Sequence, residues 1–264
     1  MLLAAGASPN ECNDNGVSTL LAAIYRNHFF IAFQLLNAGA NPYLQDKKEG
    51  FFPLFLAAEK GNAALVSACL MRDASQINQK VIIHSKKSAL FVAVELKHKE
   101  VIALLLRYGA DPNGIQESDQ VRPLLKSVQL KDLDVARALL EAGADPNLQN
   151  TKGISPLREA VSFGHTALVA LLLEYGADPK MKGNLGMTPE EIVNADAYPA
   201  VASLLKQHHK IIPIPIKRQA ALLSYKRKIF SCFPAKNWAN EIMQKDSGFN
   251  SEQRHSPKQK PVKI

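Results

Sequence analysis

Gly143-Ala144-Asp145-Pro146-Asn147 is the stretch that decides the fold, because close copies of it recur along the chain. The leading glycines are 33, 70, 34 and 33 residues apart, and 70 is two units of 35 with one degenerate copy between them. A fixed period near 33 residues indicates stacked supersecondary units instead of one globular core. Such a chain is more typical of binding proteins than of enzymes. The other copies begin at Gly6, Gly39, Gly109 and Gly176.

The unit that starts at Gly153 shows how each copy is organised. Ser155 is placed to cap a first helix, and Pro156 stands at the first helical position, where a missing N–H costs nothing. Gly176 ends a second helix, because a C-terminal cap needs a positive φ that glycine reaches without penalty. Pro179 then prevents the helix from continuing. The second helix is predicted from an apolar stripe at i, i+3, i+4 and i+7, formed by Leu168, Leu171, Leu172 and Tyr175.

This pattern resembles the ankyrin repeat, whose family signature is Thr-Pro-Leu-His-x-Ala, then Gly-His, then Leu-Leu and Gly-Ala-Asp. Here Ser155-Pro156-Leu157-Arg158-Glu159-Ala160 is followed by Gly164-His165, Leu171-Leu172 and Gly176-Ala177-Asp178. The resemblance covers about residues 1–207 and agrees at many positions in several copies. It implies an all-α, ankyrin-type helical solenoid with protruding loop or β-hairpin fingers, followed by a basic C-terminal tail.

Two features depart from the family signature. The exit of the second full unit, Met71-Arg72-Asp73-Ala74, has lost its glycine. The signature histidine is absent, so we expect its hydrogen bonds to be replaced mostly by apolar packing. Its positions hold Leu21, Phe55, Phe91, Leu125 and Arg158.

Three regions are expected along the chain. Residues 1–209 form the solenoid, with a partial first repeat, about five further units and a degenerate last unit that serves as a polar cap. Residues 210–245 form an extended linker and an amphipathic helix, and residues 246–264 form a disordered basic tail. Because residues 1–10 are the end of a repeat without its first helix, we expect either a piece of a longer protein or a true start upstream.

The charge of the chain is concentrated in its C-terminal part. The net charge is +8, but residues 207–264 hold 12 Lys and Arg against 3 Asp and Glu, so the preceding part is close to neutral. Any argument for an anionic partner therefore belongs to the tail. No apolar run is long enough to span a bilayer, and the apolar N-terminus lacks the basic leader of a signal peptide. We expect a cytoplasmic protein, or one in the host cytoplasm if it is a secreted effector.

Catalytic, cofactor and metal sites are not expected. His28, His98 and His165 occupy the same slot between the two helices of their units, and units two apart are too distant to share a metal. The three cysteines show no metal-ligand spacing and no histidine at a recurring offset. Every glycine has a turn or cap role, so no phosphate-binding loop is indicated. We therefore predict no enzymatic activity, no cofactor and no small-molecule substrate.

The finger loops are the better candidates for binding, since partners of the ankyrin family usually lie along the concave face of fingers and first helices. The second and third fingers are basic and the fourth is acidic, a pattern that could orient a charged partner; the alternative is that these side chains are simply solvated. The third finger also carries Val81-Ile82-Ile83, which either packs back or contacts a partner. The predicted partner-binding residues are Lys47, Lys48, Lys80, Lys86, Lys87, Glu117, Asp119 and Lys152.

The tail is a separate candidate. Residues 211–216 alternate Pro with Ile and should be extended. Residues 217–233 are compatible with a basic amphipathic helix that lies on an anionic membrane, enters a partner's groove or covers the last repeat. A nucleic-acid patch rests on three residues and is not favoured, and Phe233-Pro234 bears only a distant likeness to the start of an F-box-like ubiquitin-ligase adaptor helix. The predicted anion-contacting residues are Lys217, Arg218, Lys226, Arg227 and Lys228.

These observations together predict a non-enzymatic scaffold or adaptor that binds a partner protein on the face formed by fingers and first helices. The alternative is a targeting adaptor or bacterial effector whose basic segment docks an anionic membrane or a ubiquitin-ligase-type complex. Both readings rest on the repeat coverage and on the separation of a neutral solenoid from a basic tail.

Overall fold

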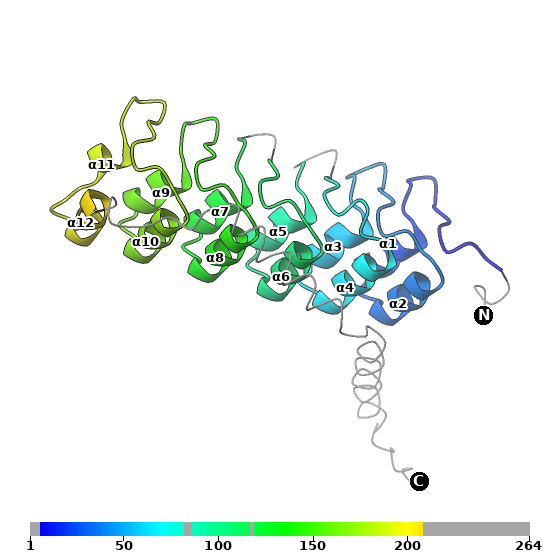
Figure 1. Ribbon diagram of the computed structural model, residues 1–264. Helices are drawn as coiled ribbons and strands as arrows, with labels where there is room; N and C mark the ends of the chain where they lie inside the picture. The colour runs from blue at the N-terminus through cyan, green and yellow to red at the C-terminus, as the bar shows by residue number, and fades with distance from the viewer. Residues whose placement is uncertain (1–5, 82–85, 117–118, 208–264) are drawn as a thin grey trace, which may run out of the picture. The chain divides into compact units, whose positions relative to one another are not determined.

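The computed structural model describes residues 6–81, 86–116 and 119–207, and within these ranges its regular elements are α-helices in six successive pairs (Figure 1). The tail beyond residue 207 lies outside the described ranges, so the predicted boundaries at 209 and 245 stay predictions. The pairs are α1 (Thr19–Tyr25) with α2 (Phe29–Asn37), α3 (Pro53–Glu59) with α4 (Ala63–Arg72), α5 (Ala89–Glu95) with α6 (Lys99–Arg107), α7 (Pro123–Gln129) with α8 (Leu133–Glu141), α9 (Pro156–Ser162) with α10 (Thr166–Glu174), and α11 (Pro189–Ile192) with α12 (Pro199–Gln207).

The helices form two layers, and Figure 1 shows the odd-numbered helices on the side from which the loops between pairs project. Each helix packs against its partner and against the equivalent helices of the adjacent pairs; α3, for instance, contacts α1, α4 and α5. The buried apolar side chains therefore form one continuous core along the stack. This is the architecture of a solenoid, in which neighbour interfaces replace a single centre.

The first helices begin where the sequence predicts. Ser155 Oγ accepts the Arg158 backbone N–H at 3.2 Å, and Ser18 and Ser88 cap α1 and α5 in the same way. This satisfies an N–H that has no partner within the helix. The start of α9 and three other starts, those of α3, α7 and α11, place proline in the first turn, where its missing N–H removes one of these unpaired donors.

The recurring exit motif is a clamp between adjacent units. Gly143 has φ of 95°, and Asp145 Oδ1 accepts the Asn147 N–H at 2.9 Å, which closes the turn after α8. The Asn147 side chain then reaches the next unit: its Oδ1 accepts the Asp178 N–H at 2.8 Å, and its Nδ2 donates to the Gly176 carbonyl at 3.0 Å. The repeated asparagine is therefore explained by the bonds it makes to the following exit. Asn113 makes the equivalent pair of bonds, to the Asp145 N–H and the Gly143 carbonyl.

One junction uses a different residue. Tyr43 stands where the exits at Gly6, Gly109 and Gly143 carry asparagine, and its hydroxyl donates to the Asp73 carbonyl at 2.8 Å. Asp73 follows α4 in an extended conformation with φ of −160°, so no residue at positive φ is needed there. This geometry accounts for the missing glycine of the degenerate exit.

The fingers are loops in the described part of the chain. Hairpin character is limited to two isolated antiparallel bridges, Cys12 with Ser18 and Lys80 with Ser88. The expectation of loop or β-hairpin fingers is therefore met by loops, because the side-chain bonds described below close them without a strand ladder.

The positions of the absent signature histidine are packed as expected. Leu21, Phe55, Phe91 and Leu125 are at most 2% exposed. Arg158 is the exception, and its guanidinium donates to the Met187 carbonyl of the next unit at 3.1 Å.

Candidate functional site

The face formed by the fingers and the odd-numbered helices is the candidate site, and we call it the finger face. Its fingers are the loops at residues 13–17, 46–50, 80–87, 116–121, 150–154 and 183–187, numbered one to six. Fingers three and four each include residues outside the described ranges. The geometry of the finger face is set by side-chain bonds inside the fingers and between them.

Buried polar side chains hold individual fingers in shape. Asp46, which is 5% exposed, accepts the backbone N–H groups of Lys48 at 2.9 Å, Glu49 at 2.7 Å and Phe51 at 3.2 Å. Asn150 accepts the N–H groups two and four residues ahead, at 3.0 and 2.9 Å. Such Asx turns fix the loop before any partner arrives, which lowers the entropy cost of binding.

Adjacent fingers are also joined to one another. The Lys47 N–H donates to the Asn15 carbonyl at 2.8 Å, and the Asn184 side chain donates to the Thr151 carbonyl at 3.0 Å. Thr151 in turn donates to the Asp119 carbonyl of finger four at 3.3 Å. Fingers one and two are thus joined to each other, and so are fingers four, five and six.

The five basic residues predicted on fingers two and three lie in different surroundings. Lys47 and Lys48 are exposed at the tip of finger two, and the Lys47 ammonium donates to the Asp14 carbonyl at 3.1 Å. Lys86 is exposed on finger three, whereas Lys80 and Lys87 are half-buried. The structure therefore does not gather these lysines into one strip.

Lys87 belongs to an ion-paired group on the floor of the finger face. Glu95, the last residue of α5, lies 2.5 Å from the Lys87 ammonium and 3.3 Å from the Lys126 ammonium of α7. Burial alone would raise the pKa of the Glu95 carboxyl, but the hydrogen bonds and charges of the two lysines outweigh it, and the pKa is lowered. These three side chains satisfy one another and leave little charge for a partner.

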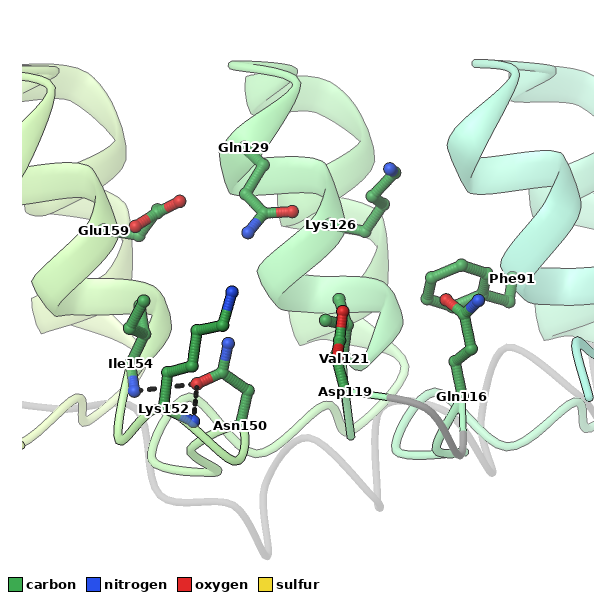
Figure 2. A pocket seen from close by; sticks show the side chains of 10 residues that line it. All are labelled: Phe91, Gln116, Asp119, Val121, Lys126, Gln129, Asn150, Lys152, Ile154 and Glu159. Carbon is green, nitrogen blue, oxygen red and sulfur yellow. Dashed lines mark hydrogen bonds between the residues drawn. The ribbon is translucent and has the colours of Figure 1, made fainter. Parts of the chain in front are cut away.

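A hollow of about 380 Å³ lies between fingers four and five (Figure 2). In Figure 2, Lys152 extends into it from finger five, while Glu159 of α9 and Gln129 of α7 border it from the helices. No ion pair holds the Lys152 ammonium or the Asp119 or Glu159 carboxylate among the described residues. Within the described residues, the hollow therefore carries charges of both signs that are not ion-paired. Its complete lining is Phe91, Gln116, Asp119, Val121, Lys126, Gln129, Asn150, Lys152, Ile154 and Glu159.

Some predicted residues cannot be placed. Glu117 of finger four lies outside the described residues, as do Ile82 and Ile83 of the apolar triplet. Val81, the first residue of that triplet, is fully buried and packs back into the core. The five predicted anion-contacting residues, Lys217, Arg218, Lys226, Arg227 and Lys228, also lie outside the described residues.

Sequence reasoning missed the helix side of the site. Glu95, Lys126, Gln129 and Glu159 face the fingers but were not singled out, because each reads as an ordinary polar residue of a short helix. The signal was available in the register of the repeats. Glu95 and Gln129 both end the first helix of their unit, and Lys126 and Glu159 both occupy its fourth position.

The recurring histidines have structural surroundings. His165 Nδ1 accepts the Leu168 N–H at 3.3 Å and caps α10, and His98 Nε2 lies 3.0 Å from the Glu59 carbonyl. In the described ranges, no three His, Cys, Asp or Glu side chains gather as metal ligands would.

The comparisons with known proteins agree with this geometry. A family model for ankyrin repeats, present in three copies, matches residues 20–116 and 124–212. This chain belongs to the ankyrin repeat family. Ankyrin repeats are generally protein–protein interaction modules and generally lack enzymatic activity.

Two solved structures share the fold over most of the chain. The ankyrin repeat domain of Bcl-3, described as a unique member of the IkappaB protein family, is 27% identical with a TM-score of 0.67, and the match covers 77% of this chain and 88% of that domain. The human ASB11 ankyrin repeat domain is 26% identical with a TM-score of 0.60, and the match covers 78% of this chain and 90% of that domain.

A curated relative is much longer than the region it shares. The transient receptor potential channel pyrexia of Drosophila melanogaster is 35% identical over 107 residues, which are 40% of this chain and 11% of the channel. The shared region therefore spans about a tenth of that relative. Within the described residues, none of the helices has the length and apolar content that crossing a bilayer requires.

Proposed function

We propose that this protein is a non-enzymatic scaffold or adaptor that binds a partner protein on its finger face. The observation that carries the proposal is the hollow between fingers four and five, where no described residue forms an ion pair with Lys152, Asp119 or Glu159. A structural ion-pair group lies directly beside it at Glu95. We assign recognition of the partner to the charges in the hollow, whereas the ion-paired group at Glu95 stabilises the floor of the finger face.

The partner is expected to insert a polar segment between the two fingers. Asn150 fixes finger five, and the Thr151–Asp119 bond joins it to finger four before binding, so the partner does not have to order finger five. Oppositely charged groups on the partner would fix the register of the complex more than they would add affinity.

A site-specific photo-crosslinker tests this face. Placed at Lys152, it should form adducts with a partner protein, whereas the same group at Ala103, an exposed residue of α6 in the other layer, should form none. The Glu159→Lys variant should lose the Lys152 adduct, because it reverses one of the recognising charges. Equal adducts from both layers, or adducts unaffected by Glu159→Lys, would refute the assignment of the face.

We further propose that the basic segment 207–264 makes a second contact with an anionic surface, because it holds 12 basic and 3 acidic residues. Removing residues 211–264 should leave crosslinking at Lys152 intact and abolish cosedimentation with vesicles that contain anionic lipid. Cosedimentation that is unchanged by the deletion would refute this contact.

A further inference from the structure

A second exposed strip runs along the stack at the opposite ends of the first helices. In the first five units, the first helix begins at a finger and ends, seven residues and about 10 Å later, at the turn that leads into the second helix. We call the residues of these turns the turn edge. They are residues 26–27, 60–61, 96–97, 130–131 and 163–164, together with Tyr198 of the last unit.

Large apolar side chains are exposed along one half of the turn edge. Leu96 is 46%, Phe163 38% and Tyr198 37% exposed. The Lys131 ammonium lies 4.8 Å from the centroid of the Phe163 ring, and the Tyr198 ring packs so closely on Gly164 that a side chain there would overlap it. The turns of the last three units are therefore in contact with one another, and Leu96 is exposed two units before Phe163.

The charged residues of the turn edge are all basic: Arg26, Lys60, Lys97 and Lys131. Carboxylates flank the turn edge on both sides: Glu59 and Glu95 end α3 and α5, and Asp132 and Asp134 lie at the start of α8. Glu95 is paired with Lys87 and Lys126, and the Lys99 ammonium lies 2.7 Å from Asp134. The turn edge thus combines an apolar stripe with cations and contains no acid of its own.

Two of these lysines occupy a backbone conformation that disfavours them. Lys97 and Lys131 have φ of 60° and 55°, and the equivalent residues of two other units are Gly61 and Gly164. A left-handed conformation costs a non-glycine residue about 1–2 kcal/mol. Each ammonium makes a contact with the next unit, Lys97 with the Leu130 carbonyl and Lys131 with the Phe163 ring, and both side chains keep further N–H donors exposed.

We propose that the turn edge is an interaction surface for an acidic amphipathic helix of a partner protein. The Leu130 carbonyl already accepts a hydrogen bond from the Lys97 ammonium at 3.3 Å, so it is not free to pair with the backbone of a partner. A helix suits this strip because its backbone groups are hydrogen-bonded within the helix. Successive units are about 8–10 Å apart, equal to six or seven helical residues, so the partner helix presents an apolar residue at every second turn. Acidic residues between them meet Lys97 and Lys131. The chain's own segment 207–264 is basic and does not fit this strip.

This surface is independent of the finger face, and a display library tests it directly. The library consists of helical 24-residue peptides with a seven-residue apolar repeat and randomised remaining positions, and it is selected on the full chain. The selected peptides should be rich in Asp and Glu. The matched variant is Lys97→Gly combined with Lys131→Gly, which removes both cations while relieving the backbone. It should raise the dissociation constants of the selected peptides about tenfold.

A control separates this surface from the finger face. Lys152→Glu should leave the affinity of the selected peptides within about twofold, because it lies at the other end of the helices. Absence of binders, binders without acidic enrichment, or equal affinity for the double glycine variant would overturn the proposal. So would recruitment of the chain to anionic vesicles through Lys97 and Lys131, since that result would assign the strip to a membrane surface.

Discussion

Replacing Asn147 by Ala removes one complete clamp between two units. The side chain accepts the Asp178 N–H at 2.8 Å and donates to the Gly176 carbonyl at 3.0 Å, and it is half-buried. A hydrogen bond of this kind contributes about 1 kcal/mol, so the free energy of unfolding should fall by about 2 kcal/mol. Urea unfolding followed by circular dichroism measures this loss.

A matched variant tests whether the loss follows the number of bonds. Asn78 makes the equivalent acceptor bond, to the Asp111 N–H at 2.8 Å, and no donor bond to the following exit. Asn78→Ala should therefore cost about half as much, about 1 kcal/mol. The ratio of the two losses is more informative than either value, because both variants remove an asparagine that bonds to the following exit.

Hydrogen exchange gives a local measurement of the same effect. In Asn147→Ala the amide of Asp178 loses its acceptor, and it should exchange about thirtyfold faster if opening of this junction limits exchange. Equal losses for the two alanine variants, or an unchanged exchange rate at Asp178, would refute the interpretation of the asparagine as a clamp.

Three further predictions follow from the backbone and charges. Lys97→Gly should raise the free energy of unfolding by about 0.5 kcal/mol in urea titration, since relief at φ of 60° exceeds the entropy cost of glycine; a loss would contradict this. Gly164→Ala should lower the free energy of unfolding by about 2–4 kcal/mol, because a Cβ would lie 2.2 Å from the Tyr198 ring. The Cβ of Gly143→Ala meets nothing within 4 Å, so this variant should lose only about 1 kcal/mol. Similar losses for the two variants would be inconsistent with this packing. Since the pKa of Glu95 is lowered in the folded state, its contribution is complete above the ordinary pKa of 4.5 and is lost as the pH falls through the lower folded value. Glu95→Gln should therefore lower the urea midpoint at pH 7 and converge with the parent protein at low pH, and a difference that persists there would exclude the ion pair as its cause.

Much of the fold could be predicted from the sequence because its determinants are local. Ser155 and Pro156 start a helix, and Gly176 ends one, through bonds and dihedral angles within a few residues. Repetition at a fixed period then places each predicted element against its equivalents in the next unit. The stacking order follows without any knowledge of long-range contacts.

The floor of the candidate site could not be predicted in the same way. Lys87, Glu95 and Lys126 are 8 and 31 residues apart and come from a finger and two helices. Their pairing depends on side-chain reach between adjacent units, which a period does not specify. Counting charges by loop grouped Lys87 with Lys86, whereas the packing of α5 directs Lys87 to the floor and leaves Lys86 exposed.

The asparagine clamps make the length of this molecule adjustable. Each clamp joins one exit to the next exit and reaches no further, so a whole unit that enters or leaves the chain disturbs bonds at only one place. An inserted unit needs an asparagine at its own exit, an N–H that donates to the asparagine of its predecessor and a carbonyl that accepts from it. The Tyr43–Asp73 junction is the exception, because its hydroxyl bond matches only the exit that follows it. Gain or loss of units is therefore easier after Asn113 and Asn147 than at Tyr43, and it changes the number of fingers without redesigning any of them.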